Sequence, residues 1–362
     1  MNGNTVPEPG MTATTKRHFV SLDGLRGVAA LCVMLFHRRW WVAGGHLMDH
    51  GYLAVDFFFM LSGFVIAYAY ENKLRSGMTF GRFALIRAIR LYPLIVVGAA
   101  LGSAYFLLHA AIPAHRSELG GVLVSIPFAM LALPTLPQAM AEPFAINRPT
   151  WSLFVEILLN LAYALVIVRL SRSLLAALTA LGFAALAVLA FAYGDLGISG
   201  TFDRLGVLLV RGCFPFLAGV LICRMFARGA LPRLPGGFAA GALLLVILFM
   251  LPRDFAGGLA WLLDLLAVGL LCPAVIISCC EHEPPRWSLG FVKPLGELSY
   301  PLYIIHYPAY YWFEIAAVRF HLPPALWLPI AVPLIVALAF AISRAIDIPV
   351  RRALNRRLAG RA

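Results

Sequence analysis

The chain has 362 residues, of which 61% are hydrophobic and 13% are charged, with a mean hydropathy of +0.86. Soluble domains contain roughly 45–50% apolar and about 25% charged residues, so this composition argues against an ordinary soluble protein and indicates a membrane protein. The net charge of +12 fits basic cytoplasmic loops better than nucleic-acid binding, which we do not expect.

Eleven apolar runs follow one another without a soluble-sized segment between them. They lie near residues 22–40, 52–70, 84–110, 118–137, 150–168, 173–193, 205–223, 236–251, 258–280, 298–317 and 324–343. We therefore expect an all-α integral membrane protein with one transmembrane domain. That domain covers residues 19–345, between a polar N-terminal segment at 1–18 and a basic tail at 346–362. None of the six cysteines forms a CxxC pair, so no metal is expected.

The first run, "SLDGLRGVAALCVMLFH" at 21–37, has charges at one end and a histidine at the other. Arg26 and His37 return to nearly the same helix face, with a rise of about 16 Å between them. Asp23 lies one turn before Arg26 and can pair with it. A snorkelling ion pair and an interfacial histidine remain open as structural alternatives. A histidine within a span, however, usually faces the protein interior or a polar cavity.

The next two runs add a carboxylate and two arginines. The segment "GYLAVDFFFMLSGF" at 51–64 places Asp56 in the outer part of the second span. The segment "RAIRLYP" at 87–93 places Arg87 and Arg90 on one face at the start of the third. Two guanidinium groups at this spacing suit a phosphate-bearing ligand, although anchoring at the cytoplasmic surface would explain them too.

The run 118–137 is the weakest candidate span. It contains Glu118, Pro127, Pro134 and Pro137, and prolines break or kink helices. We expect a re-entrant or surface segment on the outer side here.

The next run, "RPTWSLFVEILLN" at 148–160, contains Trp151 and Glu156. A carboxylate is costly in lipid, so Glu156 should face the bundle interior. Trp151 is either an interfacial aromatic or part of a site. Arg211 and Asp264 are embedded in later runs, and a structural pair between them is one interpretation.

The run near 298–317 contains "GELSYPLYIIHYP", with Tyr303 toward the cytoplasmic side and His306 well inside the span. A hydrogen-bonded core histidine is the structural alternative for His306. The sequence leaves the oligomeric state open, including a homo-oligomer.

Basic residues set the expected orientation. The tail after Arg344, the segment 71–90 and the N-terminal segment are rich in lysine and arginine, so all three should be cytoplasmic. Both ends inside require an even number of crossings. Leaving out 118–137 gives about ten transmembrane helices. The arginines then gather at the inner ends, and His37, Asp56 and Glu156 gather in the outer half.

Taken together, four stretches resemble the transmembrane acyltransferase family 3. They are "LDGLRGVAALCVMLFH", "GYLAVDFFFMLSGFVI", "RAIRLYP" with "WSLFVEILL", and "SYPLYIIHYP". The resemblance covers about residues 19 to 345. It implies an integral-membrane O-acyltransferase of the bacterial inner membrane. The acyl group, usually acetyl, would come from cytoplasmic acetyl-CoA and go to a hydroxyl of an extracytoplasmic glycan or a similar acceptor.

The family motifs fall on Arg26 and His37, on Arg87 and Arg90, on Trp151 to Glu156 and on His306. Roles follow as expectations. His37 is the general base, Asp56 orients it, and Glu156 positions the acceptor or holds Arg211. The CoA phosphates bind the three arginines at positions 26, 87 and 90. Substrate contacts are expected from Trp151, Arg211, Tyr303 and His306.

Two alternatives remain. His37 could itself be acylated before transfer. A transporter or flippase of a glycan or a lipid-linked sugar would also have many spans and embedded charges, but it should show internal repeats, and the sequence contains none.

Overall fold

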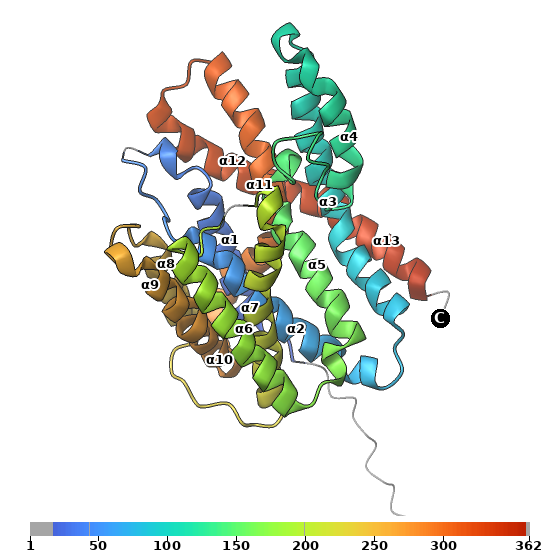
Figure 1. The fold of residues 1–362 in the computed structure, drawn as a ribbon, viewed down its shortest axis with the longest axis vertical. Helices are drawn as coiled ribbons and strands as arrows, with labels where there is room; N and C mark the ends of the chain where they lie inside the picture. The colour runs from blue at the N-terminus through green and yellow to red at the C-terminus, as the bar shows by residue number, and fades with distance from the viewer. Residues whose placement is uncertain (1–16, 43, 199, 360–362) are drawn as a thin grey trace, which may run out of the picture.

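A computed structural model describes residues 17–42, 44–198 and 200–359, and within them the chain is helical and contains no β-strand (Figure 1). The expected all-α class is therefore confirmed. The division into a polar N-terminal segment, one transmembrane domain and a basic tail stays a prediction. Residues 1–16 of the N-terminal segment lie outside the described residues.

The helices follow the predicted apolar runs closely. The first seven are α1 (Val20–Phe36), α2 (Ala54–Arg75), α3 (Phe80–Ala110), α4 (Leu119–Met130), α5 (Thr150–Leu165), α6 (Arg172–Tyr193) and α7 (Leu205–Phe226). The others are α8 (Phe238–Met250), α9 (Ala260–Leu266), α10 (Cys272–Glu281), α11 (Leu289–Arg319), α12 (Trp327–Ile342) and α13 (Ile348–Ala359). A π-helical turn joins α9 to α10, and another joins α12 to α13.

Six helical segments of the described chain are long and apolar enough to cross a membrane. They are Gly51–Arg75, Phe80–Ala110, Arg172–Tyr193, Phe202–Phe226, Gly257–Glu281 and Pro324–Ala359. The protein is thus a multi-pass integral membrane protein. The predicted spans in α1, α5 and α8 have 17, 16 and 13 residues. Ten crossings and cytoplasmic ends therefore stay predictions.

Helix α4 occupies the run that was expected not to cross. It has 12 residues, and at 1.5 Å per residue it is about 18 Å long, which is short of a hydrocarbon core of about 30 Å. It packs against α3 and ends before the loop that leads to α5. Figure 1 shows the end of α3 and α4 together, projecting from one end of the bundle.

Two helix pairs form the centre of the molecule: α1 packs on α11, and α2 packs on α7. Glycines allow this close approach. A Cβ added to Gly63 would collide with the carbonyl oxygen of Phe216, and one added to Gly219 would collide with that of Met60. Small residues at such crossings let helix backbones come close, which is how membrane helices gain packing energy.

Replacing Gly63 with alanine should therefore destabilise the bundle. The new methyl group would meet a backbone atom that cannot rotate away, and overpacking of this kind costs roughly 1–3 kcal/mol. The melting temperature of the purified protein in detergent measures the effect. Gly81→Ala is the matched control, because nothing lies within 4 Å of its added Cβ. Equal melting temperatures for the two variants would contradict the packing argument.

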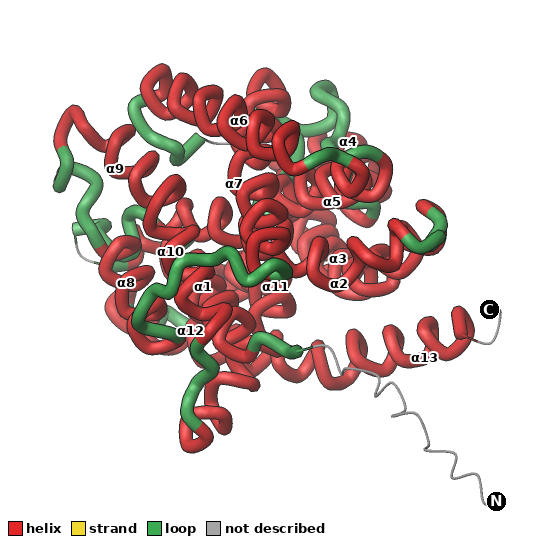
Figure 2. The backbone as a smooth tube through the Cα atoms, turned by 90° about the horizontal axis from the view of Figure 1, so that it is seen from below, coloured by secondary structure: helices red, strands yellow, loops and turns green. Residues whose placement is uncertain are grey.

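Helix α13 packs against α3 and runs away from the bundle (Figure 1). Figure 2 shows it extending sideways from the body of the protein. It has no buried residues and carries four arginines, at positions 351, 352, 356 and 357. A basic helix in this position suits the surface of a membrane with anionic lipids.

Candidate active site

The three arginines expected to bind phosphate line one cavity, which we call the arginine cavity. Arg26 comes from α1, and Arg87 and Arg90 come from adjacent turns of α3. The other polar side chains of its lining are Ser62, Ser152, Glu156, Ser299, Tyr300 and Tyr303. The structure therefore brings together Arg26 and the pair on α3, which are distant in sequence. Their role as CoA ligands stays a prediction.

Positive charge in the arginine cavity is only partly neutralised. Arg26 pairs with Asp23 at 2.7 Å, as expected, and Arg87 pairs with Glu156 at 3.3 Å. The buried Nε atom of Arg87 has no hydrogen-bond partner among the described residues. Arg90 has no ion-pair partner in the described part of the chain. The cavity therefore keeps guanidinium donors that an anion could use.

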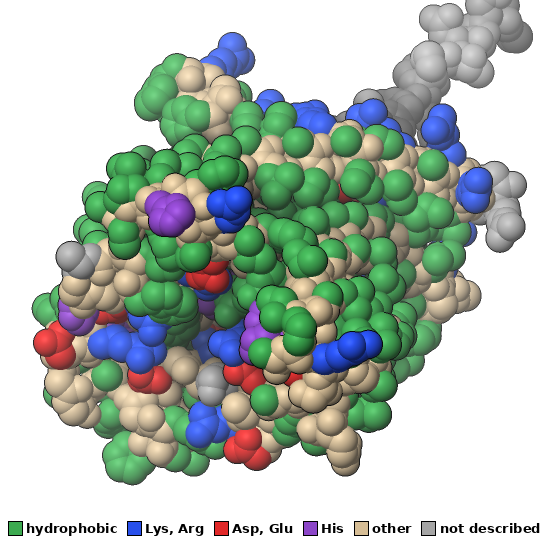
Figure 3. All heavy atoms as spheres, turned by 90° about the horizontal axis from the view of Figure 1, so that it is seen from above, with side chains coloured by type: hydrophobic (Ala, Val, Ile, Leu, Met, Phe, Trp, Pro, Cys, Tyr) green, Lys and Arg blue, Asp and Glu red, His purple; other side chains and the backbone are tan. Residues whose placement is uncertain are grey.

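A second cavity, of about 410 Å³, lies toward the other end of the bundle. We call it the histidine cavity, because His37 lines it. Its other polar and aromatic lining residues include Arg39, Trp40, Tyr52, Glu142, Arg148, Trp151, Arg211, Arg253, Tyr303 and Tyr307. Figure 3 looks onto this end of the molecule, where basic, acidic and histidine side chains gather around a hollow.

Val55 and Tyr303 line both cavities. The phenol oxygen of Tyr303, on α11, is 2.6 Å from the hydroxyl oxygen of Ser152, on α5. The tyrosine hydroxyl is also 3.3 Å from the carbonyl oxygen of Pro149, to which it can donate. Tyr303 was expected to contact substrate, and its position between the cavities is compatible with that role.

His37 stands at the end of α1, and its ring stacks on the ring of His306. The ring centroids are 5.3 Å apart and the planes differ by 20°. Tyr307 meets His37 edge-on at 5.2 Å. Among the described residues, no hydrogen bond engages the imidazole of His37. Its ring nitrogens are therefore available to a molecule in the histidine cavity.

His306 lies behind His37 and lines neither cavity. It is fully buried, and its Nδ1 donates to the carbonyl oxygen of Leu302 at 3.0 Å. Since a carbonyl only accepts, Nδ1 carries the proton and Nε2 is left as an acceptor. That Nε2 has no partner among the described residues. His306 lines neither cavity, so its contact with substrate stays a prediction.

Asp56, expected to orient His37, makes no hydrogen bond to it among the described residues. Both oxygens of Asp56 bind the guanidinium of Arg211, at 3.0 Å from Nε and 2.5 Å from Nη2. Arg211 also donates to the carbonyl oxygen of Tyr52. The close packing of α2 on α7 places the two side chains opposite each other, so Asp56 is committed to Arg211 and not to His37.

The alternative pair between Arg211 and Asp264 is also absent. Asp264 accepts hydrogen bonds from the Tyr52 hydroxyl at 2.9 Å and from the backbone N–H of Leu196 at 2.7 Å. Asp56 and Asp264 therefore accept hydrogen bonds from different donors: Asp56 from Arg211, and Asp264 from Tyr52 and Leu196.

The sequence predicted that Glu156 would lie in the outer half of the bundle, where it would position the acceptor or hold Arg211. Instead it lines the arginine cavity, where it accepts from Ser62 at 2.8 Å and pairs with Arg87. Helix α5 begins only at Thr150 and carries Glu156 nearly two turns into the bundle. Arg211 pairs with Asp56 and not with Glu156.

Breaking the Asp56–Arg211 pair should destabilise the protein strongly. Both side chains are at most 1% exposed, and removing one partner of a buried pair leaves an uncompensated charge, at a cost of about 3–5 kcal/mol. Asp56→Leu should therefore lower the melting temperature far more than the double variant Asp56→Leu, Arg211→Met, in which no charge remains. A double variant that melts lower than the single one would contradict this reading.

The structure adds residues that the sequence did not single out. Ser62 holds Glu156, Tyr307 packs on His37, and Arg39 and Arg148 line the histidine cavity. Burial lowers the pKa of Arg39. Burial also opposes the charge of Arg148, but Tyr307 and Glu142 outweigh it and raise the pKa of that guanidinium. Tyr307 follows His306 directly in the sequence, and that position could have indicated it. Arg39 and Arg148 lie outside the α-helices, so no helical spacing links them to other site residues.

A multi-pass helical protein with an arginine-lined cavity beside a histidine-lined one has the layout of an enzyme embedded in a membrane. The family model described as an acyltransferase domain matches residues 19–344. The chain therefore belongs to the acyltransferase 3 family, and it is a membrane acyltransferase by family.

Relatives with acyltransferase names share parts of the chain. A protein of Komagataeibacter xylinus named as a membrane-bound transacylase, BcsY, is 27% identical over 332 residues, which cover 84% of this chain and 78% of that protein. The acyltransferase MdmB of Streptomyces mycarofaciens is 33% identical over 159 residues, 40% of this chain and 38% of that protein.

"Protein 2 in picA locus" of Rhizobium radiobacter is 38% identical over 164 residues, 42% of this chain and 85% of that protein. No solved structure matches the chain.

Proposed function

We propose that this protein is an O-acyltransferase of the bacterial inner membrane. It would move an acyl group, by family resemblance acetyl, from cytoplasmic acyl-CoA to a hydroxyl of an extracytoplasmic glycan or a similar acceptor. The observation that carries this proposal is the pair of cavities, which share Val55 and Tyr303. One offers guanidinium groups for a phosphate-bearing donor, and the other offers an imidazole for the acceptor.

The donor would enter through the arginine cavity. At about 100 Å³ this cavity is too small for the whole of CoA, so it would take the thin pantetheine arm, and the phosphates would stay at its mouth. Arg90, which has no carboxylate partner among the described residues, is then the strongest phosphate ligand of the three. Arg87 would contribute the Nε–H that has no partner in the described structure.

The acceptor would occupy the histidine cavity. Its aromatic side chains, Trp40 and Trp151 among them, give flat apolar faces of the kind on which a sugar ring can rest. Arg39 and Arg148 would donate hydrogen bonds to ring substituents. These contacts orient a hydroxyl toward His37.

The transfer itself needs one base and one leaving group. His37 takes the proton of the acceptor hydroxyl while the oxygen attacks the thioester carbonyl. The tetrahedral intermediate collapses, the carbon–sulfur bond breaks, and the CoA thiolate receives the proton from His37. Stacking on His306 holds the base in place. If His37 is acylated first, the same residue acts as nucleophile, and the kinetics become ping-pong.

Tyr303 stands where the acyl group would pass, so its hydroxyl can donate to the thioester carbonyl. Tyr303→Phe should lower kcat about tenfold, the worth of one neutral hydrogen bond, while the KM for acetyl-CoA stays the same. The ring is retained, so packing is preserved. Ser152→Ala removes the hydroxyl that lies 2.6 Å from the Tyr303 oxygen. It tests whether the effect of Tyr303 on kcat depends on that hydrogen bond. A Tyr303→Phe enzyme with unchanged kcat would exclude the hydroxyl from the reaction.

Thioester consumption tests the proposed function. Purified protein in detergent is supplied with acetyl-CoA and extracts of cell-surface glycan, and free thiol is measured. We expect thiol release that depends on the acceptor, together with a new ester in the glycan by mass spectrometry. Glycan movement across vesicles without thiol release would instead support the transporter alternative and overturn the proposal.

A further inference from the structure

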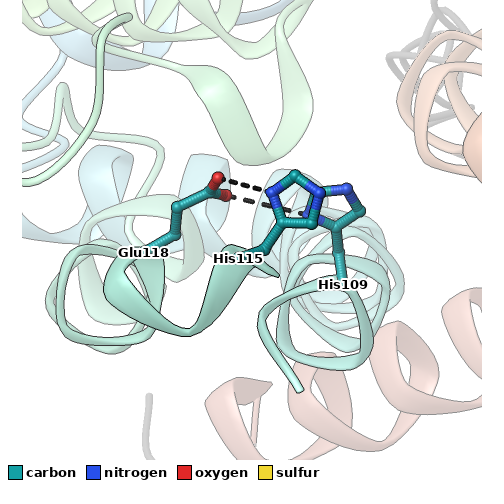
Figure 4. Close-up of side chains that lie close together, drawn as sticks. All are labelled: His109, His115 and Glu118. Carbon is teal, nitrogen blue, oxygen red and sulfur yellow. Dashed lines mark hydrogen bonds and ion pairs between the residues drawn. The ribbon is translucent and has the colours of Figure 1, made fainter. Parts of the chain in front are cut away.

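Two histidines and a glutamate form a cluster at the end of α3, and none of them lines the arginine or the histidine cavity. His109 belongs to the last turn of α3, and His115 and Glu118 belong to the 3-10 helix η3 (Pro113–Glu118) that leads into α4. Figure 4 shows both imidazole rings facing the carboxylate. We propose that these three side chains bind a zinc ion.

The ligand atoms lie close to the spacing that zinc requires. In a tetrahedral site with bonds of about 2.0–2.1 Å, neighbouring ligand atoms lie about 3.3 Å apart. Nδ1 of His115 is 3.0 Å from Oε1 of Glu118, and Nδ1 of His109 is 3.7 Å from Oε2. One donor atom from each residue can be chosen so that all three lie within 4.8 Å of one another. Small side-chain rotations would therefore bring the set to ideal distances.

Without a metal the cluster is incompletely satisfied. His115 hydrogen-bonds Glu118, whereas His109 is too far from the carboxylate for a hydrogen bond. The two imidazole rings nevertheless lie against each other, with centroids 3.9 Å apart. A divalent cation would engage both imidazoles and the carboxylate at once.

The ligand types favour zinc over magnesium or calcium. Two imidazoles and one carboxylate are a common zinc set and leave a fourth position for water. The side chains are 33%, 39% and 47% exposed for His109, His115 and Glu118, so water reaches that position. Magnesium and calcium prefer sites made of oxygen atoms alone.

The bound ion would tie two elements together. His109 and Glu118 bracket the turn between α3 and α4, so a shared metal would hold α4 in place against α3. A ligand that binds only the folded state raises the melting temperature.

The full-length protein tests this proposal, with its affinity tag removed because a histidine tag binds zinc. Metal-free protein in detergent is titrated with zinc chloride by calorimetry. We expect one zinc per chain and a higher melting temperature. Cobalt in place of zinc should give the visible absorption of a tetrahedral site. Absence of stoichiometric zinc binding would overturn the proposal.

Variants locate the ion. His109→Ala, His115→Ala and Glu118→Gln should each weaken zinc binding at least about tenfold, in line with the losses seen even for outer-shell partners of metal sites. His46→Ala is the matched control, because His46 also pairs with a single carboxylate three residues away, Asp49 at 2.8 Å. Zinc affinity that survives all three cluster variants, or that falls equally in the control, would place the ion elsewhere and overturn the assignment.

Discussion

Replacing His37 with alanine should reduce acyl transfer by about 10²–10⁴-fold while acetyl-CoA still binds. His37 is the histidine that lines the cavity proposed for the acceptor, and no described hydrogen bond occupies its imidazole. A positioned general base contributes about 10²–10⁴-fold to the rate, so residual turnover should fall within that range below the parent. The arginine cavity has no contribution from His37, so the dissociation constant for CoA should not change.

The measurement pairs thiol release with calorimetric CoA binding on the same preparation. His46→Ala is the control, since His46 is exposed and lines neither cavity. Wild-type turnover in His37→Ala would show that the base is another group. A trapped acyl group on His37 of the parent enzyme, formed before acceptor is added, would select the covalent route.

Removing Arg87 and Arg90 should weaken CoA binding by a large factor. Hydrogen bonds to charged groups contribute about 1.5–3 kcal/mol each, so each alanine variant should lose about tenfold to a hundredfold in affinity. The double variant should lose more than either single one. Lysine at position 90 should recover part of the loss, because it keeps the charge but cannot bind phosphate bidentately.

Arg82→Ala is the matched control for these arginines. Arg82 lies near the start of the same helix, is exposed and does not line the arginine cavity. The affinity of the parent protein should also fall as salt rises, because the contacts are ionic. Unchanged CoA affinity in both alanine variants would show that the arginine cavity does not bind CoA. The role of His37 would then still be decided by the His37→Ala experiment.

Much of the fold follows from composition and apolar runs, since lipid requires continuous helices whose backbone groups bond internally. The same runs predicted that the segment 118–137 would not cross, and this stays a prediction: α4 has 12 residues there, but the predicted span in α8 has only 13. The number of crossings depends on how short helices such as α5 and α8 sit in the bilayer. Helix length alone does not decide this.

Part of the site was also predictable. Arg87 and Arg90 share one helix face by spacing, and the resemblance to the family joined them to Arg26. The partners of the carboxylates were not predictable. Asp56 meets Arg211, and Glu156 meets Arg87, whereas the sequence favoured neither pairing. Nor did it indicate that Tyr303 would lie between two cavities.

The sequence by itself determined the helical membrane class, the acyltransferase 3 family and which polar groups share a face of their own helix, such as Arg87 and Arg90. Periodicity and residue type suffice for these, because they are properties of a single helix. Only the tertiary structure decided which side chains meet, including the stack of His37 on His306 and the pair of Asp56 with Arg211. Those contacts depend on how each helix is rotated against its neighbours. For α2 and α7, which carry Asp56 and Arg211, Gly63 and Gly219 allow the close approach.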